Sequence, residues 1–112
     1  MLDRAEDRRS HKRQNLACPT ALFAKGGKML ARGRTINISD GGALVSIPRD
    51  TAPEISANVN ARFSVPRSTP NTYMLEQFAS SACVVRRQAL VDDSRAGVAV
   101  RFSKPLKLGL EV

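Results

Sequence analysis

Small polar residues gather at the end of a strand-like segment in the sequence RTINISDGGALVSI. Apolar and polar residues alternate up to the turn, so Ile38 should face the interior while Asn37 and Ser39 project together from the opposite face. The Asn37 amide both donates and accepts hydrogen bonds, which suits the edge of a base, and Ser39 offers a hydroxyl. Gly41 and Gly42 allow a positive φ or the close approach of another group. The stretch predicts either a plain tight turn or a turn that holds a ligand.

A second group of reactive side chains lies near the N-terminus, in the sequence RRSHKR. Three residues separate Arg9 from Arg13, and Arg8 stands directly before the pair. The planar guanidinium of arginine forks onto phosphate oxygens or the O6/N7 edge of guanine, and it also stacks on bases. Each two-pronged contact contributes on the order of 1–3 kcal/mol of discrimination. Taken alone, the segment favours a solvated charge run or a nonspecific nucleic-acid-binding arm over a specific binding site.

Catalytic chemistry is poorly supported by the sequence. The one histidine, His11, lies in the polar N-terminal segment, where no strand would orient it for a catalytic triad. Cys18 and Cys83 are far apart in the chain and make a poor metal-ligand set with that histidine. No phosphate-loop lysine motif or dinucleotide-binding glycine motif is present. We therefore expect a binding protein without catalytic residues, a metal site or a cofactor.

Length and charge narrow the class of protein further. The 112 residues suffice for one domain, and the formal net charge of +8 favours anionic partners. No apolar segment follows the basic N-terminus, and no run approaches the ~20 apolar residues that cross a bilayer. We therefore expect a cytoplasmic protein without membrane insertion, in which Cys18 and Cys83 are small buried thiols.

The elements that must position these residues read as six short strands. Strand-like runs cover 16–24, 28–38, 43–47, 57–65, 78–90 and 98–102, separated by turns and by a longer loop with two prolines at 66–77. This spacing predicts an antiparallel sandwich or small barrel. We expect a flexible basic arm over 1–15, a β-barrel over 16–103 and a C-terminal tail over 104–112. The tail is compatible with one helical turn or an extended strand.

Together, Arg9-x-x-x-Arg13 and Asn37-x-Ser39-x-x-Gly42 resemble the two-part signature of the PilZ family, an RxxxR arm followed by [D/N]xSxxG at a strand end. The sequence AGVAVRF, Ala96–Phe102, also resembles the closing strand of that family. The resemblance covers most of the chain, from about Arg8 to Phe102. It implies an all-β, six-stranded antiparallel β-barrel that binds cyclic di-GMP, a bacterial second messenger, with a short helix often following the barrel.

The resemblance also implies a role for each motif residue. Arg9 and Arg13 would grip guanine edges and phosphates, while Asn37 and Ser39 would hold a guanine against the barrel. Arg8 would add a stacking or phosphate contact, and a basic residue at this place goes with binding of an intercalated ligand dimer in the family. The implied ligand-binding residues are Arg8, Arg9, Arg13, Asn37, Ser39, Gly41 and Gly42.

The resemblance thus implies a second-messenger receptor that relays a ligand-induced rearrangement to another protein, in motility or exopolysaccharide machinery. One alternative is a small basic β-barrel that binds nucleic acid. Few aromatic residues are available to stack on bases, because Phe63 and Phe102 fall at core positions and leave mainly Tyr73 and two other Phe. Nucleic acid is therefore the less favoured partner. A ligand-free protein-interaction domain is the other alternative.

Overall fold

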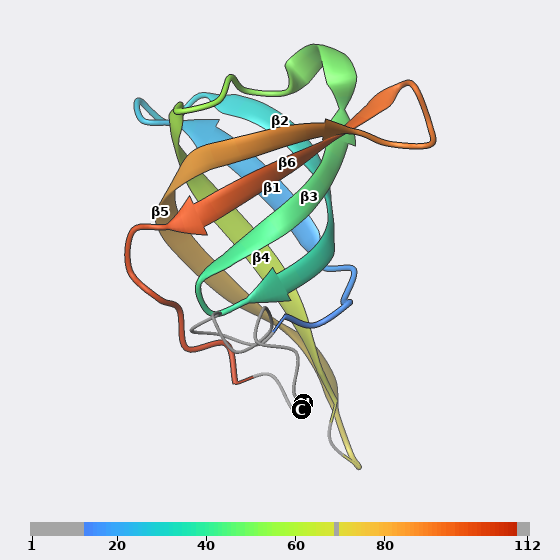
Figure 1. The fold of residues 1–112 in the computed structure, drawn as a ribbon. Coiled ribbons are helices and arrows are strands. Elements are labelled where there is room, and N and C mark those ends of the chain that lie inside the picture. Colours follow the sequence, from blue (N-terminus) through green and yellow to red (C-terminus); the bar gives the residue numbers. More distant parts are fainter. Residues whose placement is uncertain (1–12, 69, 110–112) are drawn as a thin grey trace, which may run out of the picture.

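Six antiparallel strands close into one barrel in the computed structural model, which describes residues 13–68 and 70–109 (Figure 1). The strands are β1 (Pro19–Ala24), β2 (Met29–Ser39), β3 (Gly42–Pro48), β4 (Asn58–Ser68), β5 (Tyr73–Ala89) and β6 (Arg95–Phe102), and a short 3-10 helix, η1 (Arg49–Thr51), follows β3. Their order around the barrel is β1-β2-β3-β6-β5-β4, and β4 pairs with β1 to complete the ring. The all-β six-stranded antiparallel barrel expected from the sequence is confirmed.

The barrel interior is filled by side chains at alternate positions of each strand. In β4, the residues Val59, Ala61, Phe63 and Val65 are all buried, as the period-two pattern predicts. The ring of Phe63 meets that of Phe102 edge to face, with centroids 5.4 Å apart. Small aliphatic residues supply most of the remaining core, which suits a narrow barrel.

The segment 66–77 differs from the long loop expected there. β4 continues to Ser68, β5 begins at Tyr73, and the two strands pair along their whole length, so the expectation of a loop is wrong. Their far ends form a two-stranded ribbon that projects beyond the barrel (Figure 1). β1 pairs with β4 only as far as Phe63, so among the described residues the part of β4 that holds Pro66 pairs only with β5, and proline is tolerated in such edge segments.

The C-terminal segment 103–109 forms neither of the two structures expected for it, a helical turn or a strand. It folds back along one end of the barrel, where Leu106 is half-buried and Leu108 is fully buried as part of the core. Gly109 has a positive φ of 67°, which a regular helix would not accommodate. Two apolar side chains therefore fix the position of this segment without regular secondary structure.

The two cysteines are both free thiols but differ in burial. Cys18 is fully buried directly before β1, as expected, and burial raises the pKa of its thiol against smaller opposing effects of the Thr35 hydroxyl and of Arg34 and Arg67. Cys83 in β5 is only partly buried, so the expectation of two buried thiols is wrong for this residue. Residues 1–12 and 110–112 lie outside the described part of the chain. The division into arm, barrel and tail therefore stays a prediction.

Candidate ligand-binding site

A β-bulge in β2 sets the direction of Asn37. The register with β3 runs from Thr35 opposite Val45 to Asn37 opposite Leu44, so Ile36 is an extra residue without its own partner. Thr35 and Ile38, three positions apart, are consequently both buried, whereas an unbroken strand would place them on opposite faces. The inward position predicted for Ile38 is confirmed.

The Asn37 side chain is half-buried, and its Oδ1 atom is enclosed without a hydrogen-bond donor in the described part of the chain. A buried acceptor that lacks a partner costs about 1–3 kcal/mol. Such an atom is a natural place for a ligand N–H, because a donor arriving there would remove that cost.

Ser39 is buried at the end of β2, where its hydroxyl closes the turn into β3. The Ser39 Oγ accepts a hydrogen bond from the Gly41 N–H at 3.2 Å and lies 3.4 Å from the Gly42 carbonyl, to which it donates. Local bonds of this kind are typical of serine in turns. The hydroxyl therefore has a structural task here, and one lone pair stays available for a ligand donor.

Gly42 is required by close packing and not by a positive φ. It lies opposite Arg101 in the β3–β6 pair, and a Cβ atom at this position would stand 2.4 Å from the Val100 carbonyl oxygen. The neighbouring Gly41 carbonyl accepts a bond from the Phe102 N–H at 3.0 Å. The turn is thus fastened tightly to the end of β6.

The segment that follows Arg13 is held against the same part of β2. Gln14 forms an antiparallel bridge with Ile38, in which each backbone N–H donates to the other residue's carbonyl, at 2.8 and 2.9 Å. Further along, the Thr35 hydroxyl accepts from the Cys18 N–H at 2.8 Å and donates to the Leu16 carbonyl. The segment from Gln14 to Cys18 therefore runs beside β2 from Ile38 to Thr35 before β1 begins.

The C-terminal segment meets the turn from the other direction, through Asp40. The Leu106 N–H donates to the Asp40 carbonyl at 2.7 Å, and the Leu108 N–H donates to the Asp40 carboxylate at 3.1 Å. Arg67 on the ribbon donates to the carbonyls of Leu108 and Gly109, and it pairs with Glu76 at 3.0 Å. Asp40 thereby links the turn to a segment that is remote in sequence.

Five of the seven ligand-binding residues predicted from the sequence lie in the described part of the chain, and they are close together at the β2–β3 turn. Asn37, Ser39, Gly41 and Gly42 form one strand end, and Arg13 directly precedes the residue that pairs with Ile38. Arg13 is exposed, as is Arg101 opposite Gly42, so an exposed arginine lies next to the strand end on both the N-terminal segment and β6. Arg8 and Arg9 lie outside the described residues, and their role stays a prediction.

The family is decided by a comparison with protein-family models. The model described as the PilZ domain matches residues 7–112, which is nearly the whole chain. This protein belongs to the PilZ family. PilZ domains are regulatory binding domains of the type that takes cyclic di-GMP, so the membership of this family predicted from the sequence is confirmed, while the roles of the motif residues stay a prediction.

A solved structure supports the same fold for this PilZ domain. The Bacillus subtilis inhibitor of motility, MotI/DgrA, superposes with a TM-score of 0.70 at 16% sequence identity. The match covers 89% of this chain and 44% of that protein, so the chain spans less than half the length of its structural neighbour. No curated protein sequence matches the chain.

Two searches within the described residues of this PilZ domain give negative results. Across 13–68 and 70–109, no group of three or more His, Cys, Asp or Glu side chains is placed to hold a metal ion. The same part of the chain contains no helix long and apolar enough to traverse a lipid bilayer.

Sequence reasoning did not find two residues of this PilZ site, Gln14 and Asp40. Gln14 contributes backbone atoms to its bridge with Ile38, and backbone pairing carries no side-chain signal. Asp40 stands in the turn-like sequence SDGG, which gives no sign that its carboxylate also anchors Leu108, 68 positions further along the chain. The alternating leucines at 106, 108 and 110 were the available hint that the tail packs against something.

Proposed function

We propose that this PilZ domain is a receptor for cyclic di-GMP, which it binds at the β2–β3 turn without catalysing a reaction. The observation that carries the proposal is the bridge between Gln14 and Ile38, because it brings Arg13 to the strand end where the Asn37 Oδ1 atom lacks a donor. A guanidinium, an unused amide acceptor and a buried hydroxyl then lie around one turn. Cyclic di-GMP presents two guanines and two phosphates, which these groups complement.

The division of tasks follows from the chemistry of each group. Asn37 would accept from a guanine N–H, since its enclosed oxygen finds no donor within 13–68 and 70–109. Arg13 would fork onto a phosphate or the O6/N7 edge of guanine, and Arg8 and Arg9 would add contacts from the preceding segment. Ser39 would contribute its free lone pair while it continues to close the turn.

Asp40 supplies a route from the ligand to the C-terminal segment. A carboxylate accepts more strongly than an amide, so a guanine seated at Asn37 would compete with the Leu108 N–H for the Asp40 carboxylate. Loss of that bond would loosen residues 106–109 and alter the surface that they cover. The receptor would then relay ligand binding to a partner protein through this segment.

Calorimetric titration tests the binding proposal and its rivals together. Cyclic di-GMP should bind, whereas GTP and a mixed RNA oligomer should not, and Arg13→Ala should weaken binding about 10-fold or more. Arg32→Ala, an exposed arginine on the same strand, is the matched control and should leave the affinity nearly unchanged. Salt-steep binding to RNA would instead support the nucleic-acid module. If the protein binds none of the three ligands, the remaining hypothesis is a ligand-free protein-interaction domain.

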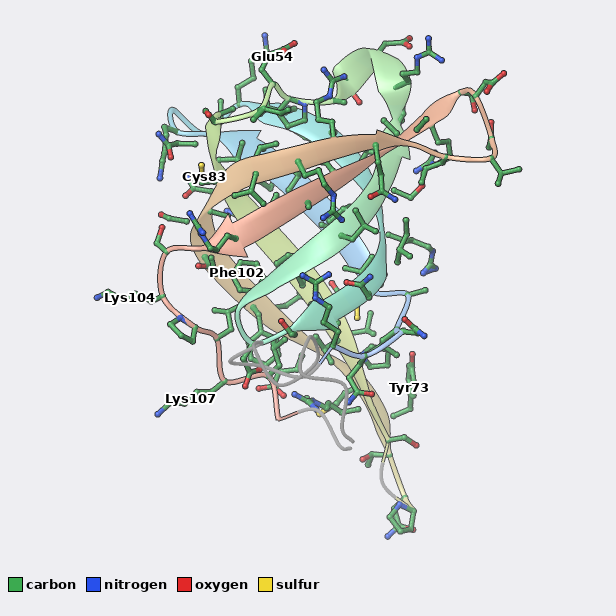
Figure 2. All side chains as sticks on the ribbon, in the orientation of Figure 1. Glu54, Tyr73, Cys83, Phe102, Lys104 and Lys107 are labelled. Carbon is green, nitrogen blue, oxygen red and sulfur yellow. The ribbon has the colours of Figure 1, made fainter. Side chains whose placement is uncertain are left out.

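Trypsin cleavage tests the relay. Lys104 and Lys107 project outward from the C-terminal segment (Figure 2), but a proline follows Lys104, so within residues 103–109 trypsin should cut only after Lys107. Cyclic di-GMP should accelerate this cut, and Asp40→Asn should accelerate it without ligand. Ligand-bound protein that is cut at the same rate as free protein would refute the relay while leaving the binding proposal intact.

The name of the structural neighbour fits a regulatory output. MotI/DgrA is an inhibitor of motility, and it shares the fold of this domain. By analogy we propose that the partner of this receptor is also a protein, of motility or exopolysaccharide machinery. The ligand-to-protein ratio from the titration will show whether one cyclic di-GMP or an intercalated dimer binds. A ratio of two would support the proposed role of Arg8 in binding the dimer.

A further inference from the structure

A depression of about 360 Å³ lies at the other end of the barrel, away from the proposed nucleotide site. Its walls carry three arginines from three different elements, Arg49 from η1, Arg87 from β5 and Arg95 from β6, and we name it the arginine depression. Leu90 and Ala96 contribute apolar surface to it. It therefore combines concentrated positive charge with an apolar lining.

Position separates the arginine depression from the β2–β3 turn. Arg95 pairs with Pro48 at the end of β3, whereas the turn joins β3 at Gly42, six residues earlier. At about 3.3 Å per residue, this separation is roughly 20 Å along the strand. Figure 2 shows the same distribution, with Glu54, the acidic neighbour of Arg87, at one end of the molecule and Lys107 at the other.

Neutral groups hold two of the arginines in place. Arg95 donates from Nε to the Ser46 Oγ at 2.7 Å and from Nη2 to the Ser46 carbonyl at 2.8 Å. Arg49 donates from Nη1 to the Asp93 carbonyl at 3.0 Å. These bonds orient the guanidinium groups without neutralising them, so the remaining N–H groups are available to an anion.

Acidic residues also lie beside the three arginines: Asp93 lines the depression, and Asp92 lies close enough to Arg95 to interact with its charge. Within residues 13–68 and 70–109, the only ion pair that involves the arginine depression joins Arg87 to Glu54 at 3.7 Å, and the Glu54 side chain is largely exposed. Exposed pairs at such distances contribute little and are easily exchanged. A carboxylate from another molecule could therefore replace Glu54 beside Arg87.

We propose that the arginine depression docks an acidic peptide segment of a partner protein, with two or more carboxylates next to an apolar side chain. Each guanidinium sits on its own element and has part of its donor set occupied, which suits several separate carboxylates. Leu90 packs over Gly97, and Val91 beside it is exposed, so an apolar side chain would find a surface there. No aromatic residue lines the depression, so a nucleobase would have nothing to stack on.

A peptide-binding assay tests the proposal on the full chain. The probe is a fluorescein-labelled decapeptide of alternating glutamate and leucine, followed by anisotropy. The triple variant Arg49→Gln, Arg87→Gln, Arg95→Gln should bind it at least about 10-fold more weakly. The control Lys25→Gln, Lys28→Gln, Lys104→Gln removes the same charge from exposed positions elsewhere and should lose less than about 3-fold.

Further measurements protect the test against misfolding. Arg95 also donates a hydrogen bond to Ser46, and the double variant Arg49→Gln, Arg87→Gln keeps that bond. This double variant should still show most of the loss in peptide affinity. Asn37→Ala should bind the peptide like the unaltered protein, which separates this proposal from that of the nucleotide site. Three results would each overturn the proposal. The two triple variants could lose the same peptide affinity, the unaltered protein could fail to bind the peptide, or an RNA decamer could bind these arginines more tightly than the peptide does.

Discussion

Replacement of Gly42 by alanine should destabilise the barrel even without ligand. The added Cβ would stand 2.4 Å from the Val100 carbonyl oxygen, well inside the 3.0 Å below which side-chain carbons essentially never approach another atom. The nearest atoms, the Val100 carbonyl oxygen and the Arg101 Cα, belong to the backbone of β6, which is paired with β3, so neither can rotate away from the added Cβ. Overpacking of this kind costs about 1–3 kcal/mol, and we expect the upper end of that range.

Thermal unfolding followed by circular dichroism measures this effect. A loss of about 2–3 kcal/mol corresponds to a fall in Tm of roughly 10–20 °C for a domain of this size. Gly26→Ala is the matched control, because no atom lies within 4 Å of its added Cβ, and its Tm should change little. A Gly42→Ala protein as stable as the Gly26→Ala protein would show that β3 and β6 are not packed as described.

Three further predictions concern single residues near the site. Cys83 should react with a thiol reagent before Cys18, whose burial and raised pKa keep it protonated; simultaneous reaction would contradict this. Thr35→Val should lower the free energy of unfolding by about 2–4 kcal/mol, because two backbone groups lose their partner, whereas exposed Thr51→Val should have a much smaller effect in denaturant titration. Asn37→Ala should leave the free protein at least as stable as the unaltered one, because it removes a buried Oδ1 atom that finds no donor among the described residues, yet weaken cyclic di-GMP binding; a large stability loss would reveal a structural role.

The period-two pattern predicted the barrel because burial alternates along its strands. Val59, Ala61, Phe63 and Val65 could be assigned to one face from the sequence alone, and Ile38 to the interior. The bulge at Ile36 could not be predicted, since the alternation in TINI fits either phase of the strand. Only the pairing with β3 decides which residue is extra.

Long-range contacts explain the remaining errors. Pro66 suggested a loop, yet among the described residues the part of β4 beyond Phe63 pairs only with β5, and proline is tolerated in such edge segments. The C-terminal segment has weak local preferences, and it takes its path from burial of Leu108 and from the Asp40 carboxylate. Such contacts depend on the completed barrel, so no local pattern reveals them.

The most direct measurement of the central proposal is an NMR titration of the labelled protein with cyclic di-GMP. The side-chain amide of Asn37 and the backbone amides of Ser39 and Gly41 should shift and saturate together, because the ligand would supply the missing donor at the Asn37 Oδ1. The amides of Gly26 and Gly27, in the turn between β1 and β2, should stay unchanged. Shifts that are absent at Asn37, or that cluster around Arg95 instead, would contradict binding at the β2–β3 turn.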